Sequence, residues 1–334
     1  MNNSVLILGA GISGLTAARY LRDREMNVVL VDKGRGVGGR VATRWKGTPD
    51  RIEGRWDHGA QFVSLRSRAL KQHLADWGCL DLLESWMPGH SDPSIPRMRP
   101  KEGMNAFPKK LAEGLEIHRG QRILKIEQQE NGWMAHSESG EIFQAAQMLS
   151  TIPMPQFLDL ARQSSLSLLP GEFSCLSSVQ YERCLTLLIE LEGPSGLSQP
   201  GYLRVNSGIL ETISDQQLKG ISNDPLLVAH ATPAFSLEWY DRDRNAAASV
   251  LRAAVQEKIS SRIRNVQIHG WKFAKPVQRI PENFLQLDNG ILLAGDGFAA
   301  GDSEIPADLH PRIESAMLSG ISAAKALLSL PTGH

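Results

Sequence analysis

Three glycines near the N-terminus, Gly9, Gly11 and Gly14, have the spacing of residues that cradle a phosphate. In such a turn the first glycine permits a tight bend, the second lets the backbone approach a pyrophosphate, and the third lets a helix pack on a strand. An apolar run over 4–8 precedes the glycines, and a helical period follows them. Free amides at the start of that helix would face the anion. The predicted cradle consists of Gly9, Gly11, Ile12, Ser13 and Gly14.

A second apolar run over 28–31 ends at Asp32, about twenty residues beyond the glycines. At this place a carboxylate accepts hydrogen bonds from a ribose. The strand, turn, helix, strand and acidic residue are all present, so an adenine dinucleotide is a better interpretation than an ordinary glycine turn. NAD and FAD both remain possible at this point.

A second glycine-rich segment, KGRGVGGR, follows Asp32 directly. Its flexible glycines would let the chain wrap the pyrophosphate from the other side, and its arginines are available cations. NAD dehydrogenases have no standard need for such a segment, and the plain alternative is a mobile loop. The contacts predicted here are Lys33, Arg35, Gly38, Gly39 and Arg40.

Both segments in this order resemble those of the amine-oxidase-like FAD flavoproteins. The stretch DHGAQFVS at 57–64 resembles the family's short turn near the isoalloxazine, and NGILLAGDGFAAG at 289–301 resembles its closing flavin motif. The resemblance implies FAD, and the surroundings of Cys175 and Cys184 suggest no covalent attachment. The further cofactor contacts implied are Gly59, Ala60, Gln61, Ile123, Gly295 and Asp296.

Several mid-chain segments follow the order of the renalase-like branch of these flavoproteins. The segment 103–133 resembles the helix and strands that return the chain to the flavin domain. The stretch 226–241, a helix over about 245–264 and the strand 268–276 resemble the substrate lobe.

The resemblance implies an oxidase of misreduced dihydronicotinamide dinucleotides, the NAD(P)H isomers. Hydride would pass to flavin N5 and the electrons to O2, giving H2O2, so the protein would mainly orient the rings and exclude water. One alternative is an amine oxidase or a desaturase-type enzyme with a larger apolar substrate; Lys272 and Lys275 are candidates for a lysine near N5, although exposed strand lysines are the simpler interpretation. A flavin-free binding partner is a further alternative.

Three side chains are candidates for the pocket. Trp271 could form a flat wall or belong to the core, His230 could point inward or be a structural histidine, and Gln61 belongs to the turn near the flavin. A basic group in a proline-rich loop could meet a substrate phosphate or be solvated. That group consists of Arg97, Arg99 and Lys101.

An acidic insert follows the closing motif, with Asp302, Glu304 and Asp308. It is longer than the same segment in the compact bacterial pattern that the chain resembles, and we expect it near the pyrimidine edge of the flavin or at the pocket mouth. There it would affect which substrates enter.

These segments predict an α/β protein of two lobes. An FAD-binding Rossmann-like domain of the glutathione-reductase or amine-oxidase type would be discontinuous, and a second α+β substrate domain would be built on an antiparallel sheet. The predicted limits are 1–66, 102–160 and 285–334 for the first domain, and 67–101 and 161–284 for the second.

Composition narrows the partners to small molecules. The 334 residues are 42% hydrophobic, with 36 basic and 36 acidic side chains, so no overall field favours nucleic acid or an anionic membrane. No apolar run reaches the roughly 18 residues of a membrane span, and the N-terminus lacks the features of a signal peptide. Three unrelated cysteines fit neither a disulfide framework nor a metal site and favour the cytoplasm. The oligomeric state stays open.

Overall fold

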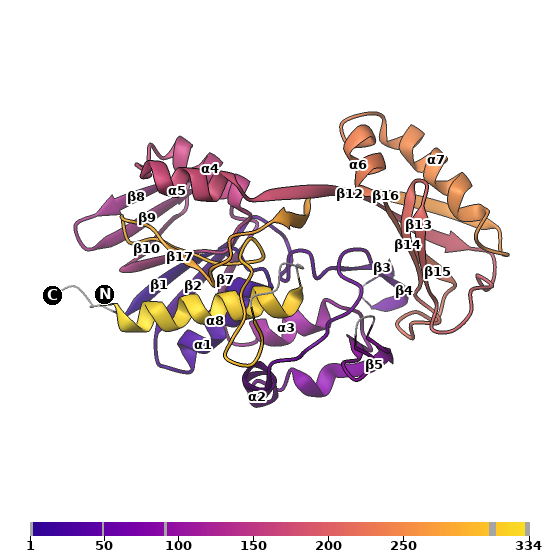
Figure 1. Cartoon of the computed structure of the whole chain (residues 1–334), viewed down its shortest axis with the longest axis horizontal. Helices are drawn as coiled ribbons and strands as arrows, with labels where there is room; N and C mark the ends of the chain where they lie inside the picture. The colour runs from indigo at the N-terminus through magenta and orange to yellow at the C-terminus, as the bar shows by residue number, and fades with distance from the viewer. Residues whose placement is uncertain (1–2, 49, 90–91, 307–311, 331–334) are drawn as a thin grey trace.

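A computed structural model describes residues 3–48, 50–89, 92–306 and 312–330. Its two largest sheets lie toward opposite ends of the molecule (Figure 1). One has six strands in the order β17-β18-β11-β1-β2-β7, and the other has five in the order β13-β14-β15-β12-β16. The sequence prediction of an α/β fold with an antiparallel second sheet is confirmed, whereas the exact domain limits stay a prediction.

The six-stranded sheet gathers strands from distant parts of the chain. Its central strands are parallel, and only β17 runs antiparallel to its neighbour. Its strands are β1 (Ser4–Leu8), β2 (Asn27–Asp32), β7 (Glu116–Arg119), β11 (Gln147–Ser150), β17 (Leu285–Gln286) and β18 (Leu292–Leu293). Both faces are covered, because Val5 and Ile7 of β1 enter one core cluster while Leu6 and Leu8 enter another.

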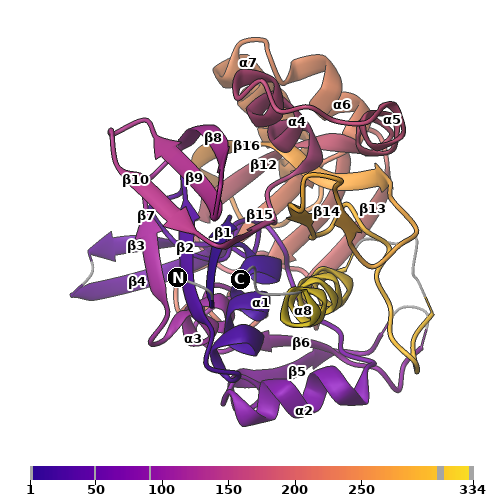
Figure 2. The ribbon, with the colours of Figure 1, turned by 90° about the vertical axis from the view of Figure 1, so that its left-hand side faces the viewer.

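Helices α1 (Ile12–Arg22) and α8 (Ile313–Ser329) pack side by side on one face of this sheet (Figures 1 and 2). They approach closely at Gly320, where an added Cβ would lie 2.3 Å from the carbonyl oxygen of Ser13. The small residues of α8 thus bring the C-terminal helix against the start of the chain. Helix α3 (Ala106–Ala112) joins the same layer.

The other face is covered by a three-stranded sheet and two helices. The sheet consists of β8 (Ile123–Gln129), β9 (Gly132–Ser137) and β10 (Ile142–Ala145), and the helices are α4 (Met154–Gln163) and α5 (Pro170–Ser177). Trp133 and Phe157 are buried in this layer together with Leu6 and Leu8 of the central strand. The carboxyl ends of β1 and β2 are left open by these layers, since Leu8 and Asp32 line a cavity.

The five-stranded sheet is antiparallel, and among the described residues helices cover one of its faces. Its strands are β12 (Gln180–Leu191), β13 (Tyr202–Ser207), β14 (Leu210–Asp215), β15 (Leu226–Ala231) and β16 (Ile263–Gln278). Helices α6 (Pro233–Trp239) and α7 (Arg244–Gln256) pack on the face that carries Leu185, Leu187 and Ile189. Side chains of alternate residues point to the opposite face.

The prediction of a helix over about 245–264 is wrong at its C-terminal end, because α7 ends at Gln256. The side chain of Gln256 closes the following turn: its Oε1 accepts from the Ile263 amide, and its Nε2 donates to the Ser261 carbonyl. Ile263 then begins β16, where Val266 and Ile268 favour an extended chain.

Two hairpins, one α-helix and one 3-10 turn complete the described fold. They consist of β3 (Thr43–Thr48) with β4 (Arg51–Asp57), β5 (Leu83–Met87) with β6 (Arg97–Pro100), helix α2 (Arg68–Asp76) and the 3-10 turn η1 (Leu80–Leu82). Leu70, Leu74 and Cys79 pack into the layer of α1 and α8, although we predicted that 67–101 belongs to the substrate domain. Among the described helices, none combines the length and the apolar character needed to cross a membrane. The cellular location stays a prediction.

Candidate active site

A cavity of about 1160 Å³ extends from the carboxyl ends of the parallel strands to the helix-free face of the five-stranded sheet. We call that face, which carries Cys184, His230 and Trp271, the cavity face. The volume exceeds the roughly 300–1,000 Å³ of most small-molecule pockets. A dinucleotide and a second small molecule can therefore share it. The edge of a parallel sheet is also where such folds bind nucleotides.

The first glycine turn has the geometry of a pyrophosphate cradle. Gly9 has φ +103°, and a Cβ on Gly14 would lie 2.0 Å from the carbonyl oxygen of Gly9, so both positions exclude side chains. A Cβ on Gly11 meets no described atom within 4 Å, because Gly11 faces the cavity at the start of α1. Ile12 and Ser13 also line the cavity.

The second glycine segment packs directly on the first. Gly38 forms a bridge to Gly11, and its amide donates to the Ala10 carbonyl at 2.8 Å. Gly38 has φ +101°, and a Cβ there would lie 2.5 Å from Cγ of Pro108. Lys33, Gly38, Gly39 and Arg40 line the cavity, whereas Arg35 is exposed and does not. Arg35 is thus a weaker candidate for a cofactor contact than we predicted.

Asp32 joins the two glycine segments. Its Oδ2 accepts from the Ala10 amide at 2.6 Å, and its Oδ1 accepts from the Gly34 amide at 2.6 Å. Burial raises the pKa of Asp32, and the two amides act against that rise. The carboxylate lines the cavity with lone pairs to spare, so it can also accept hydrogen bonds from ribose hydroxyls.

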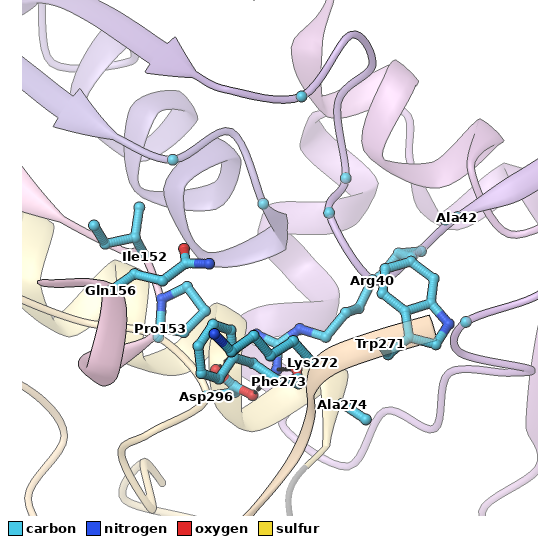
Figure 3. Close-up of a pocket in the computed structure, with 18 of the residues that line it drawn as sticks. Arg40, Ala42, Ile152, Pro153, Gln156, Trp271, Lys272, Phe273, Ala274 and Asp296 are labelled. Atoms are coloured by element: carbon cyan, nitrogen blue, oxygen red, sulfur yellow. Dashed lines mark hydrogen bonds and ion pairs between the residues drawn. The ribbon is translucent and has the colours of Figure 1, made fainter. Parts of the chain in front are cut away.

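Arg40 and Asp296 form a bidentate ion pair beside the glycine cradle (Figure 3). The two contacts measure 2.5 and 2.8 Å, and Tyr181 donates to the same carboxylate at 3.2 Å. Arg40 also donates to the Phe273 carbonyl on β16. Because an unpaired carboxylate would repel a pyrophosphate, the arginine lets Asp296 lie next to an anionic ligand.

Trp271 lies in the wall of the cavity (Figure 3). Its Nε1 donates to the carbonyl oxygen of His58 at 2.9 Å, and its ring stacks on the His58 ring with a centroid distance of 5.3 Å. His269 makes an edge contact with both rings. The indole is therefore held in one orientation by its neighbours.

His230 lines the cavity, but both ring nitrogens have partners. Nδ1 lies 3.1 Å from Thr212 Oγ1, and Nε2 lies 3.3 Å from the His58 carbonyl oxygen. Burial lowers the pKa of His230 to about 4 and that of His58 to about 3. Both rings are therefore neutral near pH 7, which fits the structural interpretation of His230 better than a role in proton transfer.

These two histidines predict a decline in stability in weak acid. An unfolded histidine takes up a proton near pH 6.5, whereas the folded rings stay neutral down to about pH 4 for His230 and about pH 3 for His58. Near pH 5 the unfolded state therefore binds about two more protons than the folded state. These protons should lower the free energy of unfolding by about 2.7 kcal/mol per pH unit.

Urea unfolding at a series of pH values, compared with the variant His230→Asn, checks this prediction. The variant retains one of the two proton differences, so its slope should be smaller by about 1.4 kcal/mol per pH unit. Equal slopes for the two proteins would show that His230 is not kept neutral by the fold.

Gln61 does not line the cavity and instead supports the turn that does. Its Nε2 donates to the carbonyl oxygens of Asp57 and Gly59, and its Oε1 lies 3.4 Å from Nζ of Lys219. Gly59 and Ala60 line the cavity. The prediction that Gln61 is a pocket residue is therefore wrong. Its amide nitrogen is hydrogen-bonded to the backbone of its own turn.

Lys219 and Asp57 form a buried ion pair that the sequence did not reveal. Nζ lies 2.7 Å from Oδ2, and both side chains are fully buried. The other oxygen of Asp57 accepts from the Thr43 hydroxyl at 2.5 Å and from the Met104 amide at 2.8 Å. The pair joins the loop after β14 to the turn after β4, whose Gly59 and Ala60 line the cavity.

The basic group predicted to meet a substrate phosphate lies away from the cavity lining. Arg99 and Lys101 both pair with Glu84 at 2.9 Å, and the Arg97 guanidinium lies 4.6 Å from the centre of the Phe62 ring. The hypothesis of a phosphate site is therefore wrong for this group. Its cations are already neutralised or stacked by neighbours.

The described acids of the insert also lie outside the cavity lining. Asp302 accepts from the hydroxyl of Ser67, the N-cap of α2, and Glu304 pairs with Arg68 at 2.9 Å. Acidic groups are stabilised at such a helix N-terminus. The expectation that the insert lies near the pyrimidine edge of the flavin or at the pocket mouth is therefore wrong for these two residues, and Asp308 lies outside the described residues.

The residues present fit FAD. A side-chain-free position, Gly11, opens on the cavity where a pyrophosphate would approach, the Asp32 carboxylate can receive a ribose, and the Arg40–Asp296 pair can face the phosphates or the ribityl chain. Ile123, Gly295, Lys272 and Lys275 line the cavity as well. Cofactor-binding roles for individual residues stay predictions.

Comparisons with known proteins point the same way. The model of the NAD(P)-binding Rossmann-like domain matches residues 7–77, and that of the flavin containing amine oxidoreductases matches residues 83–328. Renalase from Mus musculus is 22% identical over 97% of this chain and 98% of its own length.

Two proteins of known structure share the fold. Putrescine oxidase bound to putrescine has a TM-score of 0.71 at 13% identity, covering 98% of this chain and 99% of its own. The CLA-producing fatty acid isomerase from P. acnes has a TM-score of 0.66 at 10% identity, covering 98% and 99%.

Proposed function

This chain belongs to the flavin-containing amine oxidoreductase family, and on that premise we propose that it is an oxidase of dihydronicotinamides, the NAD(P)H isomers, with O2 as the acceptor. It is a flavin-dependent oxidoreductase with FAD as its cofactor, and it is similar to renalase over nearly its whole length. When bound, FAD supplies a hydride acceptor at N5 of its ring, and reoxidation by O2 would give H2O2. The dihydronicotinamide substrate and the acceptor O2 are the proposed parts.

Trp271 is the observation that carries the proposal. Its indole is fixed by the His58 carbonyl and offers the cavity a flat surface on which a dihydropyridine ring can lie. Transfer of a hydride from such a ring needs orientation rather than a strong base. The neutral, hydrogen-bonded His230 beside it is compatible with that requirement.

The neighbouring residues perform three tasks in this proposal. The glycine segments and Arg40 hold the anionic part of the cofactor, the His58 to Ala60 turn borders its ring end, and the buried Lys219–Asp57 pair keeps that turn in place. His58, which stacks on Trp271, is only 6% exposed, so water is kept from that side of the indole.

Anaerobic stopped-flow spectroscopy tests the proposal. Bleaching of the flavin absorbance near 450 nm (an approximate property of flavins) is followed after mixing with NADH, its 2- and 6-dihydro isomers, and a panel of amines. We expect fast bleaching by the isomers, and about one H2O2 per substrate oxidised in air.

The amines test the second candidate function. Amine oxidation is favoured by Lys272 and Lys275, which line the cavity as a lysine near N5 would require. Bleaching by an amine but by none of the dihydronicotinamides would support that function and contradict the first. If neither class bleaches the flavin, larger apolar substrates become the better hypothesis.

A further inference from the structure

Glu211 reaches the cavity because β14 carries an irregularity at this position. Leu210 pairs with Ala231 and Thr212 pairs with His230, so Glu211 is an extra residue between two successive pairs. Such a bulge changes the direction of a side chain and often lies next to an active site. Glu211 accordingly lines the same cavity as Trp271.

The Glu211 carboxylate has no hydrogen bond or ion pair with any residue that the structure describes, although it is half-buried. Arg204 of the adjacent strand β13 lies opposite Thr212 but forms no ion pair with Glu211, and two further neighbours on the cavity face carry no charge. Burial raises the pKa of Cys184 to about 12 and lowers that of His230 to about 4, so both are neutral near pH 7. A half-buried carboxylate without a partner is costly unless a ligand satisfies it.

The separation of Glu211 from Trp271 suits a single ring with one substituent. Strands β14 and β16 are three strand spacings apart in the sheet, which corresponds to about 14 Å. Each side chain covers part of that distance. The space that remains lies in front of Cys184 and His230, which also line the cavity.

We propose that Glu211 determines specificity by accepting a hydrogen bond from the N–H group of the substrate's primary carboxamide. The inference rests on the proposed function, since a dihydronicotinamide carries that carboxamide on its ring. A carboxylate can accept but not donate. It therefore selects an amide and repels a carboxylate at the same place, which is discrimination by an unfavourable contact as well as a favourable one.

The experiment uses the FAD-loaded protein and anaerobic flavin reduction. The substrates are the dihydro isomers of NAD and the same isomers with a carboxylic acid in place of the carboxamide. The variants are Glu211→Ala and Glu211→Gln, and the matched control is Glu257→Ala, an exposed glutamate at the end of α7 that does not line the cavity. The concentration dependence of the rate gives Kd and a limiting rate constant.

We expect Glu211→Ala to raise Kd for the carboxamide substrates by about tenfold or more, as loss of a hydrogen bond to a charged group does. Glu211→Gln should raise it by no more than about threefold, because its amide oxygen still accepts. The native protein should bind the acid analogues at least about tenfold more weakly than the amides, and Glu211→Ala should remove that difference. The control should behave as the native protein does.

Three results would overturn the inference. The first is a Kd for Glu211→Ala within about twofold of the native value while the isomers still reduce the flavin, and the second is an equal loss in Glu257→Ala. The third is equal loss of binding in both Glu211 variants together with reduction by an amine, which would assign the carboxylate to an ammonium group. Failure of every dihydronicotinamide to reduce the native protein would instead contradict the proposed function itself.

Discussion

Replacing Gly11 by valine should raise the Kd for FAD by about a hundredfold or more while leaving the apoprotein folded. An added Cβ at Gly11 meets no described atom within 4 Å, and the φ of −74° suits a β-branched residue. The new side chain would extend into the cavity, where the pyrophosphate approaches the start of α1. Loss of two hydrogen bonds to a charged group, at about 1.5–3 kcal/mol each, accounts for the expected change. The fold should lose no more than about 1 kcal/mol, the scale of a helix N-cap effect.

Quenching of flavin fluorescence during titration of the apoprotein measures this Kd, and thermal unfolding of the apoprotein measures stability. Gly171→Ala is the control, because its Cβ also meets no described atom and it lies outside the cavity lining. Gly14→Ala should behave differently from both: its Cβ would lie 2.0 Å from the backbone of Gly9, so stability and FAD binding should fall together. A Kd for Gly11→Val within about threefold of the native value would place the pyrophosphate elsewhere.

The glycine segments could be predicted from the sequence because each requirement is local. A tight turn, a close approach to a ligand and a helix packed on a strand each restrict one position, and the surrounding strand and helix have their own periodicity. Gly9 and Gly38, with φ near +100°, illustrate this, since the backbone itself demands glycine there. Family resemblance then indicated Asp296, but not that Arg40 would neutralise it.

The side chains that border the proposed substrate on the cavity face could not be predicted in the same way. Glu211 faces the cavity through a bulge, and a shift of one residue in a strand reverses the face on which a side chain lies. Arg97 and its neighbours have positive charges suited to phosphate. In the fold, however, Arg97 lies over the Phe62 ring and the other two form ion pairs with Glu84. These outcomes depend on tertiary partners that no local pattern specifies.

Lys219 is the clearest case of such a partner, and Lys219→Met should lower the free energy of unfolding by about 3–5 kcal/mol. Its ammonium lies 2.7 Å from Asp57 with both side chains fully buried, and the two residues are far apart in the sequence. Methionine fills a similar volume but leaves the Asp57 carboxylate with only the dipoles of Thr43 and Met104. An unpaired buried charge is what makes breaking such a pair costly.

Urea unfolding of the native protein, Lys219→Met and the control Lys258→Met measures the effect. Lys258 is exposed on the turn after α7, so its replacement should change stability by no more than about 0.5 kcal/mol. The flavin absorbance of Lys219→Met should also shift, since the turn that Asp57 anchors continues into Gly59 and Ala60 of the cavity wall. If Lys219→Met were as stable as the Lys258 variant, the ion pair would not hold the turn, and the order of the cavity wall would have to come from Gln61 and the backbone alone.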